Sequence, residues 1–322
     1  MRAASPGSDD LSSVDRGANL DTGFRWAALG AGCAILALLG LITVSTVYEA
    51  WPAFRESGPS FLTSDRWAPS RDAFGALAMI YGTAVVSLIA LVLSVPVSIG
   101  IALFTSEMAP RQLRGVIILV IDLLAAVPSV VYGLWGVLFV APTLVPIYES
   151  ISDAVGTWPV LGTFFGGGAG SGRSFMTAGM ILALMITPII TSVTREVFAT
   201  VPRGEKDAAL ALGASRWEMI RGAVLPHSFG GMVGATMLGL GRAMGETIAL
   251  ALTLGASFQI TTELFRSGSA MPATIALEWG ESSGTHRAAL IGLGVVLFMA
   301  TIGVNSAARA VVRRAEHRMR GG

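Results

Sequence analysis

The chain has 322 residues, of which 53% are hydrophobic and only 13% are charged, and its mean hydropathy is +0.67. A soluble domain would carry roughly 25% charged residues, so the composition excludes an ordinary soluble protein and predicts a membrane protein. The net charge of +1 argues neither for nor against nucleic acid, and none is expected as a partner. The single cysteine, Cys33, cannot form an internal disulfide and is expected to be a small packing residue.

Six apolar runs follow one another along the chain, each long enough to cross a hydrocarbon layer of about 30 Å. They cover residues 26–48, 73–104, 115–140, 174–194, 230–256 and 288–308. The first is too long for a signal-peptide core and lacks a clear cleavage site, so we expect it to be retained. The sequence thus predicts an all-α polytopic membrane protein, with a disordered polar tail at 1–25, a transmembrane domain at 26–312 and a basic tail at 313–322.

The distribution of basic residues predicts the orientation, because cytoplasmic segments are enriched in Lys and Arg. With the N-terminus inside, 15 basic residues lie in inner segments and 6 in outer ones. The inner ones are Arg2, Arg16, Arg25, Arg111, Arg114, Arg195, Arg203, Lys206, Arg216, Arg221, Arg309, Arg313, Arg314, Arg318 and Arg320. Both termini are therefore expected in the cytoplasm, and the protein in a lipid bilayer.

Two outer segments are longer than simple linkers. Residues 141–173 are rich in Pro and Gly and end in a glycine run. Because no lysine or helix signature follows that run, we expect a flexible loop and not a phosphate cradle. The second segment, 259–287, holds a short apolar stretch around 275–279, which we expect at the membrane surface.

Residues 207–226, DAALALGASRWEMIRGAVLP, carry the strongest local motif. An alanine-rich helix, a glycine turn and a second amphipathic helix predict a helix–turn–helix on the cytoplasmic face, with the proline starting the next span. The spacing resembles the EAA loop by which permeases of ABC importers dock their ATPase. The matching residues are Asp207, Ala208, Ala209, Gly213, Leu225 and Pro226. Asp207 stands where that motif usually has Glu, and Ala223 replaces a bulky aliphatic residue, so both departures are mild.

Three further segments extend the resemblance from about residue 74 to the C-terminus. They are SEMAPRQLRG (106–115), AVPSVVYGLWG (126–136) and GLGRAMGETIAL (239–250). They are similar to the PstC family of phosphate importer permeases, within the binding-protein-dependent transport permeases. The resemblance implies a type I ABC importer permease that forms half of a phosphate pathway. Its implied partners are a PstA-like permease, two copies of a PstB-like ATPase and a PstS-like phosphate-binding protein.

Arg242 and Glu246 are charged residues inside the apolar segment 230–256. Arg242 lies roughly 18 Å along a helix from residue 230, near the middle of the membrane, where a charge usually faces a cavity or a partner. Its guanidinium suits bidentate contact with a phosphate. Spaced i and i+4, the two side chains are expected on one side of a helix, where Glu246 could hold Arg242 or accept a hydrogen bond from protonated phosphate. The alternative is a structural ion pair that joins two helices.

Pro128 and Ser129 interrupt the predicted third span. Pro128 leaves a backbone carbonyl without its helical partner, and Ser129 can donate to that carbonyl or to an anion. A structural kink and a role in the substrate pathway both remain open. We take Arg242, Glu246 and Ser129 as the candidate pathway residues.

The sequence contains no catalytic triad, no Walker A sequence and no metal-ligand cluster. The chain is therefore expected to have no enzymatic activity, cofactor or metal, and to depend on a separate subunit for ATP hydrolysis. Two alternatives stay open: an ABC permease for another oxyanion, such as sulfate or molybdate, and an anion secondary transporter or channel that works alone. The docking motif favours the importer, because a free-standing transporter has no need of it.

Overall fold

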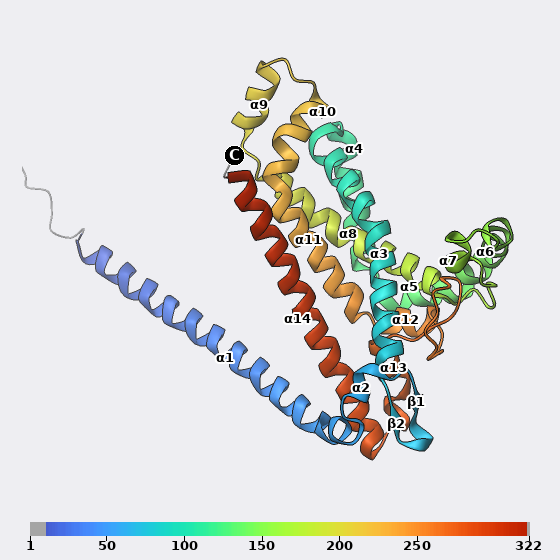
Figure 1. Ribbon diagram of the computed structural model, residues 1–322. Helices are drawn as coiled ribbons and strands as arrows, with labels where there is room; N and C mark the ends of the chain where they lie inside the picture. Colours follow the sequence, from blue (N-terminus) through green and yellow to red (C-terminus); the bar gives the residue numbers. More distant parts are fainter. Residues whose placement is uncertain (1–10, 321–322) are drawn as a thin grey trace, which may run out of the picture. The chain divides into compact units, whose positions relative to one another are not determined.

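The structure is a computed structural model that describes residues 11–320 (Figure 1). Its α-helices are α1 (Leu11–Ser57), α2 (Ser60–Thr63), α3 (Leu77–Leu103), α4 (Arg111–Ala126), α5 (Ser129–Trp135), α6 (Ala141–Val155), α7 (Leu161–Phe165), α8 (Phe175–Ala199), α9 (Arg203–Ala211), α10 (Arg216–Met219), α11 (Leu225–Gly245), α12 (Ile248–Thr253), α13 (Met271–Glu278) and α14 (Gly284–Arg320). The π-helical turns η2 (Phe104–Met108), η3 (Gly136–Val140) and η4 (Ile220–Val224) continue α3, α5 and α10. Two 3₁₀ turns, η1 (Pro69–Arg71) and η5 (Trp279–Glu281), and a small hairpin of β1 (Trp67–Ala68) and β2 (Ala73–Phe74) complete the chain.

The chain divides into two compact units, 1–49 and 50–322. Most of α1 forms the first unit. This helix begins at Leu11, whereas the sequence predicts a disordered tail up to residue 25 and a span from 26. No proline lies between 11 and 25, so the helical backbone can extend ahead of the apolar run. The first ten residues of the predicted tail lie outside the described residues.

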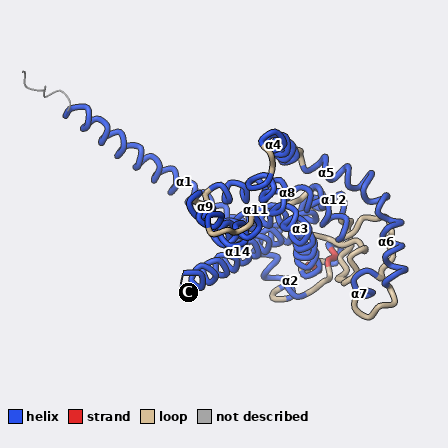
Figure 2. Tube along the Cα trace, turned by 90° about the horizontal axis from the view of Figure 1, so that it is seen from above, coloured by secondary structure: helices blue, strands red, loops and turns tan. Residues whose placement is uncertain are grey.

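Helix α8 lies at the centre of the second unit, between α3 and α11 and in contact with α4 and α12 (Figure 2). Glycines allow the close packing, since small residues let membrane helices approach each other. A Cβ added to Gly179 would lie 2.4 Å from Ile89 of α3, and one added to Gly239 of α11 would lie 2.6 Å from Ile190 of α8. The main core therefore forms around α8.

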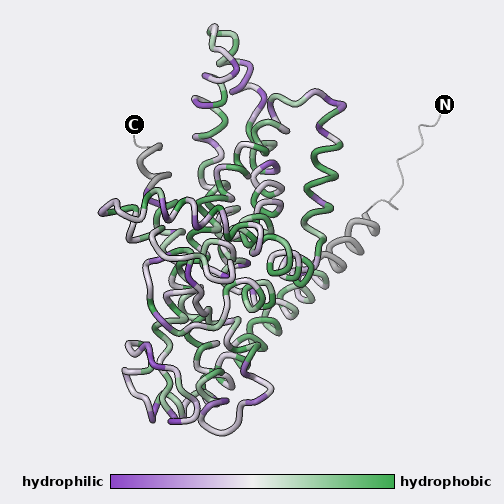
Figure 3. The backbone as a smooth tube through the Cα atoms, turned by 90° about the vertical axis from the view of Figure 1, so that its right-hand side faces the viewer, coloured by the Kyte–Doolittle hydropathy of each residue, from purple (hydrophilic) through white to green (hydrophobic). Residues whose placement is uncertain are grey.

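The two ends of the second unit are more polar than its middle (Figure 3). At one end, α9 and α10 gather with the start of α4 and with η2 (Figure 1). Lys206 of α9 and Glu107 of η2 form an ion pair of 2.5 Å there. At the other end, α2, the hairpin and α13 surround a core that includes Phe61, Trp67 and Phe74. Within this unit, the basic segments predicted on the inner side thus lie at one end.

Six helices of the described residues are long and apolar enough to span a membrane. They are Thr22–Ser57, Leu77–Met108, Ser129–Val155, Phe175–Ala199, Arg216–Gly245 and Gly284–Arg314. The expected number of spans is confirmed, but two predicted boundaries are wrong. The third predicted span, 115–140, breaks before Pro128, and the fifth, 230–256, breaks at Glu246. The predicted basic tail at 313–322 continues α14 as far as Arg320.

Both outer segments are more ordered than the sequence predicts. The expected flexible loop 141–173 contains α6 and α7, and a Cβ at Gly172, whose φ is +76°, would lie 2.2 Å from the Ala141 carbonyl oxygen. Gly172, at the end of the glycine run, is therefore needed for close packing. In the second segment, Met271–Thr274 of α13 are buried, and the Met271 amide donates to Thr83 Oγ1 at 3.0 Å. This helix enters the bundle, while the surface position predicted for 275–279 applies only to its exposed far end.

The orientation remains a prediction that thiol labelling can test. Ser171 and Ser215 are exposed and lie beyond opposite ends of α8. In a Cys33→Ala background, an impermeant thiol reagent should label Ser171→Cys from outside intact cells. It should label Ser215→Cys only after the cells are opened. Labelling of both from the same side would contradict the predicted orientation.

Candidate functional site

The break between α4 and α5 is built around Pro128. Val127, the residue before this proline, has an extended backbone (ψ 127°), as proline requires of its predecessor. Pro128 has no N–H, so carbonyls of α4 lose their helical partners. The Leu124 carbonyl is satisfied by the Val127 amide at 3.3 Å and by the Tyr132 hydroxyl at 3.0 Å. Ser129 is the half-buried first residue of α5, and no hydrogen bond of its side chain occurs among the described residues.

A second break separates α11 from α12. Helix α11 ends at Gly245, and Glu246 is extended (ψ 127°). The Glu246 side chain is only 8% exposed, and its Oε1 accepts from the Ala249 amide at 3.3 Å. This contact caps the start of α12, because the first amides of a helix have no partner within it. The expectation that Glu246 and Arg242 share one face of a continuous helix is therefore wrong, and no ion pair joins them in the described part of the chain.

The two breaks lie side by side because α5 packs directly on α12. A Cβ added to Gly133 would lie 3.0 Å from the Ala249 Cα, and one added to Gly136 would lie 2.7 Å from Thr253 Cγ2. Only glycine permits so close an approach of the two backbones. The structure thereby brings the break at Pro128 and the break at Glu246 to one place in the bundle.

Arg242 lies in the last turn of α11 at about half the depth of the bundle. Gly239 packs on Ile186 and Ile190, in the middle of α8, and Arg242 is three residues further along, about 4.5 Å. Its side chain is exposed on the isolated chain and lies in the neighbourhood of the Tyr132 side chain. No ion pair or hydrogen bond of Arg242 occurs within 11–320. A cation without a counter-charge thus lies beside both breaks.

Sequence reasoning missed four residues of this site. The Tyr132 hydroxyl satisfies the Leu124 carbonyl, and Gly133 and Gly136 permit the close contact of α5 with α12. Arg173 was counted only as an outer basic residue, yet its Nη2 donates to the Ala251 carbonyl of α12 at 3.1 Å, and its buried Nε has no partner in the described structure. The spacing of Gly133 and Gly136 behind Pro128 was a signal available for the close packing of α5.

The predicted helix–turn–helix forms at one end of the bundle. Helix α9 carries Asp207, Ala208 and Ala209, and the chain turns at Gly213, whose φ is +87°. Ser215 and Glu218 form a capping box that starts α10.

The sequence predicts that a new helix, the next span, begins at Pro226. The structure shows no separate helix there. Instead, α10, η4 and α11 run on as one helix, and the π-helical turn at 220–224 immediately precedes Pro226, which lacks an N–H. Leu225 is half-buried and Pro226 exposed in the first turn of α11.

The outer face of this hairpin is apolar, although it lies at the polar end of the bundle. Leu212 is 91% exposed and Trp217 is 61% exposed. Beneath them, Met219, Ile220 and Val224 pack against Phe198 and hold the hairpin in place. An ion pair of Lys206 with Glu107 at 2.5 Å adds to this anchorage, and His227 Nδ1 lies 3.4 Å from Glu205 Oε2. Exposed apolar side chains on a fixed hairpin indicate a surface for another protein.

These features together define a class: a multi-pass membrane protein with interrupted helices at mid-depth and a helix–turn–helix hairpin at one end. Residues 94–321 match the family described as binding-protein-dependent transport system inner membrane component. The chain belongs to this family. It is therefore a transport permease component.

Similar proteins cover nearly the whole chain. The phosphate transport system permease protein PstC of Xylella fastidiosa (strain Temecula1) is 40% identical over 97% of this chain and 95% of its own length. The protein of the same name from Mesorhizobium japonicum is 40% identical over 95% of this chain and 94% of its own. PstC 2 of Mycobacterium tuberculosis is 41% identical, with 94% of each chain covered.

Solved structures share the fold at low sequence identity. A chain of a bacterial alginate ABC transporter matches with a TM-score of 0.57 at 14% identity, over 92% of this chain and 95% of the other. A chain of the inward-facing methionine transporter MetNI matches with a TM-score of 0.54 at 13% identity, over 78% of this chain and 99% of the other. The predicted type I ABC importer permease architecture is thus confirmed.

The contact of α5 with α12 can be tested with a larger side chain. Gly133→Val places atoms where the Ala249 backbone lies, so we expect the free energy of unfolding to fall by about 1–3 kcal/mol through overpacking. Thermal melting in detergent, followed by size-exclusion chromatography, measures the loss.

Gly115→Val in α4 is the matched control, because a Cβ there meets nothing within 4 Å. Equal melting temperatures of the two variants would show that the close approach at Gly133 is unimportant.

Proposed function

We propose that the chain is the permease subunit of an ATP-driven phosphate importer and forms half of its translocation pathway. The observation that carries the proposal is Arg242, a mid-depth cation that makes no ion pair within 11–320 and lies beside two helix breaks. Curated relatives that match along their whole length are named phosphate transport permeases, which supports phosphate as the substrate.

Arg242 would be the principal contact of the anion. A guanidinium presents parallel N–H donors that match two oxygens of a phosphate. Because Arg242 is exposed on the isolated chain, its side chain is available to a pathway formed with a second permease, which by resemblance would be PstA-like. Charge at this depth is costly without such a role.

Ser129 and Glu246 would support Arg242. Ser129 has a free hydroxyl in the first turn of α5. Glu246 uses Oε1 to cap α12, and its Oε2 makes no hydrogen bond among the described residues, so Oε2 can accept a hydrogen bond from the O–H of a hydrogen phosphate. Sulfate lacks that proton at neutral pH, which favours phosphate over this oxyanion.

The hairpin would dock the ATPase. Asp207, Ala208, Ala209, Gly213, Leu225 and Pro226 keep the spacing of the docking motif, and Leu212 and Trp217 present apolar surface to a partner. By resemblance the partners are two copies of a PstB-like ATPase and a PstS-like phosphate-binding protein that delivers phosphate from outside. ATP binding would move the hairpins and switch the pathway, with both termini of this chain in the cytoplasm.

Uptake of labelled phosphate by vesicles that contain the assembled transporter tests the substrate. Arg242→Lys keeps the charge and loses the planar fork, so uptake should fall about tenfold or more, as expected for one lost charged hydrogen bond. Arg71→Lys, on an outer turn, is the matched control and should transport normally. Normal uptake by Arg242→Lys and Arg242→Ala would remove Arg242 from the pathway.

The same assay separates phosphate from other oxyanions. Excess unlabelled sulfate or molybdate should leave phosphate uptake unchanged. Strong competition by either would favour the rival view of a permease for that oxyanion. Uptake by the chain alone, without an ATPase, would favour a free-standing transporter or channel.

The docking hairpin can be tested at its turn. Gly213 has room for a side chain, but its φ of +87° strains any β-branched residue. Gly213→Val should therefore distort the hairpin and reduce co-purification of the ATPase, while the protein still inserts. Gly213→Asn is the control, since asparagine tolerates this backbone better than other residues. Full ATPase association and transport by Gly213→Val would contradict the docking role.

A further inference from the structure

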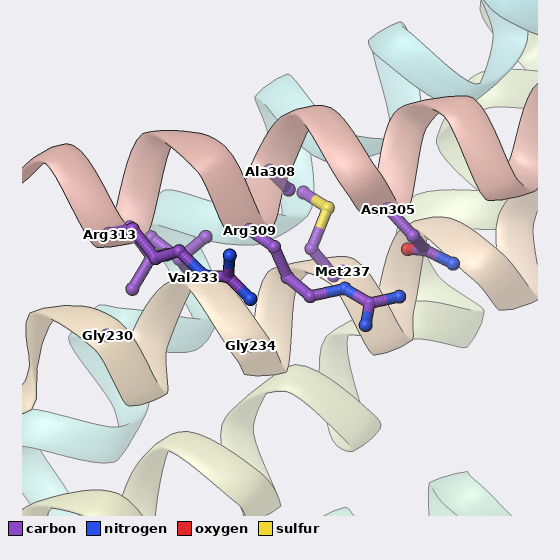
Figure 4. Close-up of a pocket in the computed structure, with 9 residues that line it drawn as sticks. Gly230, Val233, Gly234, Met237, Asn305, Ala308, Arg309 and Arg313 are labelled. Carbon is purple, nitrogen blue, oxygen red and sulfur yellow. The ribbon is translucent and has the colours of Figure 1, made fainter.

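A groove between α11 and α14 contains two arginines that the proposed function does not use. Its volume is about 430 Å³. The lining residues are Gly230, Val233, Gly234, Met237, Asn305, Ala308, Arg309, Val312 and Arg313. Figure 4 shows the side chains of Arg309 and Arg313 lying between the two helices, with Asn305 beyond Arg309.

The floor of the groove is made by glycine. Gly230 and Gly234 are one turn apart on α11, and a Cβ added to Gly234 meets nothing within 4 Å. The space above Gly234 is therefore open, and the two helices are separated here instead of being in close contact. Val233, Met237 and Ala308 supply apolar walls.

The arginines have no counter-charge in the described part of the chain. None of the ion pairs there includes Arg309 or Arg313, and both side chains are exposed. A neighbouring hollow of about 460 Å³ is lined by the same two residues and by Ser306 and Arg314. Three arginines thus gather within six residues of α14.

The groove runs from the docking end of the bundle towards its apolar middle. Gly231, next to Gly230, packs against Val197 near the end of α8 that leads to the hairpin. Met237 lies about 10 Å further along α11, close to the level of Gly239 and the middle of α8. The arginine charges thus lie towards the hairpin end of the groove, and its apolar walls lead from there towards the middle of the membrane.

We infer that this groove binds one anionic phospholipid of the inner leaflet. Its phosphate would lie between Arg309 and Arg313, since arginine forms bidentate pairs with phosphate oxygens. One acyl chain would follow Val233 and Met237, and the Asn305 amide can donate to an ester carbonyl at the deeper end. Basic pockets between membrane helices on the cytoplasmic side suit such headgroups. The site is separate from the pathway at Arg242.

Native mass spectrometry of the full-length permease, with the subunits that co-purify, tests this inference. Phosphatidylglycerol is titrated against phosphatidylcholine, which carries the same phosphate but no net charge. We expect one tight phosphatidylglycerol per chain. Arg309→Gln with Arg313→Gln should weaken its binding roughly fivefold for each arginine, while the matching lysine pair keeps most of it.

Two matched controls separate this site from general attraction to basic surface. Arg111→Gln with Arg114→Gln removes two charges from the same membrane side in α4 and should leave phosphatidylglycerol binding unchanged. Gly234→Leu should fill the groove and weaken binding although both arginines remain. Gly303→Leu, an equally open position on α14, should not weaken it.

Three results would overturn the inference. The first is equal affinity of the wild-type protein for the two lipids. The second is displacement of phosphatidylglycerol by excess inorganic phosphate, which would indicate an anion site with no need for acyl chains. The third is a combined result: the wild-type protein binds no lipid, and the Gly234→Leu variant no longer assembles with the other subunits. This result would indicate that a helix of another subunit fills the groove.

Discussion

Backbone polar groups inside a membrane must find partners within the protein, and this constraint governs the structure around Arg242. A helix can be broken at mid-depth only where neighbouring groups satisfy the exposed amides and carbonyls. At the break before Pro128, the Tyr132 hydroxyl takes that role for the Leu124 carbonyl. At the second break, the Glu246 carboxylate takes it for the Ala249 amide. Each interruption is therefore stabilised by a side chain that lies within five residues of it.

The same constraint explains why the two breaks meet. An interrupted helix is tolerated where protein, and not lipid, surrounds it, and the close contact of α5 with α12 supplies that surrounding. Gly133 and Gly136 make the contact possible because any side chain would separate the backbones. Arg242 lies in the last turn of α11, at this meeting point of the two breaks. Its side chain is therefore exposed beside them at about half the depth of the bundle. The position of the cation follows from the packing of the two short helices.

Sequence patterns predicted the number of spans and the helix–turn–helix hairpin, but not the geometry of the site. Apolar runs reveal length, and the motif at 207–226 specifies its own turn through Gly213. The break at Glu246 has a weaker local signature: no proline precedes it, and although Gly245 and Thr247 beside it are poor helix formers, glycine is also frequent within uninterrupted membrane helices. It arises from the carboxylate that caps α12 and from packing against α5, which sequence periodicity does not report. Likewise, the order in 141–173 depends on contacts such as the stacking of Tyr148 on Phe265, with ring centroids 4.2 Å apart.

The helix that includes α11 connects the two proposed sites, the hairpin and Arg242, by covalent structure alone. From Arg216 this helix continues through η4 to Gly245, about 45 Å, with the turn at Gly213 preceding one end and Arg242 close to the other. The π-helical turn next to Pro226 is the one irregularity of this rod within the described residues, and its buried side chains Ile220 and Val224 fix it to α8 through Phe198. A displacement of the hairpin can therefore be accommodated in two ways: the helix bends at η4, or the whole rod moves. At Gly231 and Gly239 of α11, the branched side chains of Val197 and Ile190 of α8 lie so close to the α11 backbone that the two helices interlock. The glycines that allow this close packing thus tie α11 to the helix at the centre of the bundle, so that a movement of the whole rod would have to carry α8 with it.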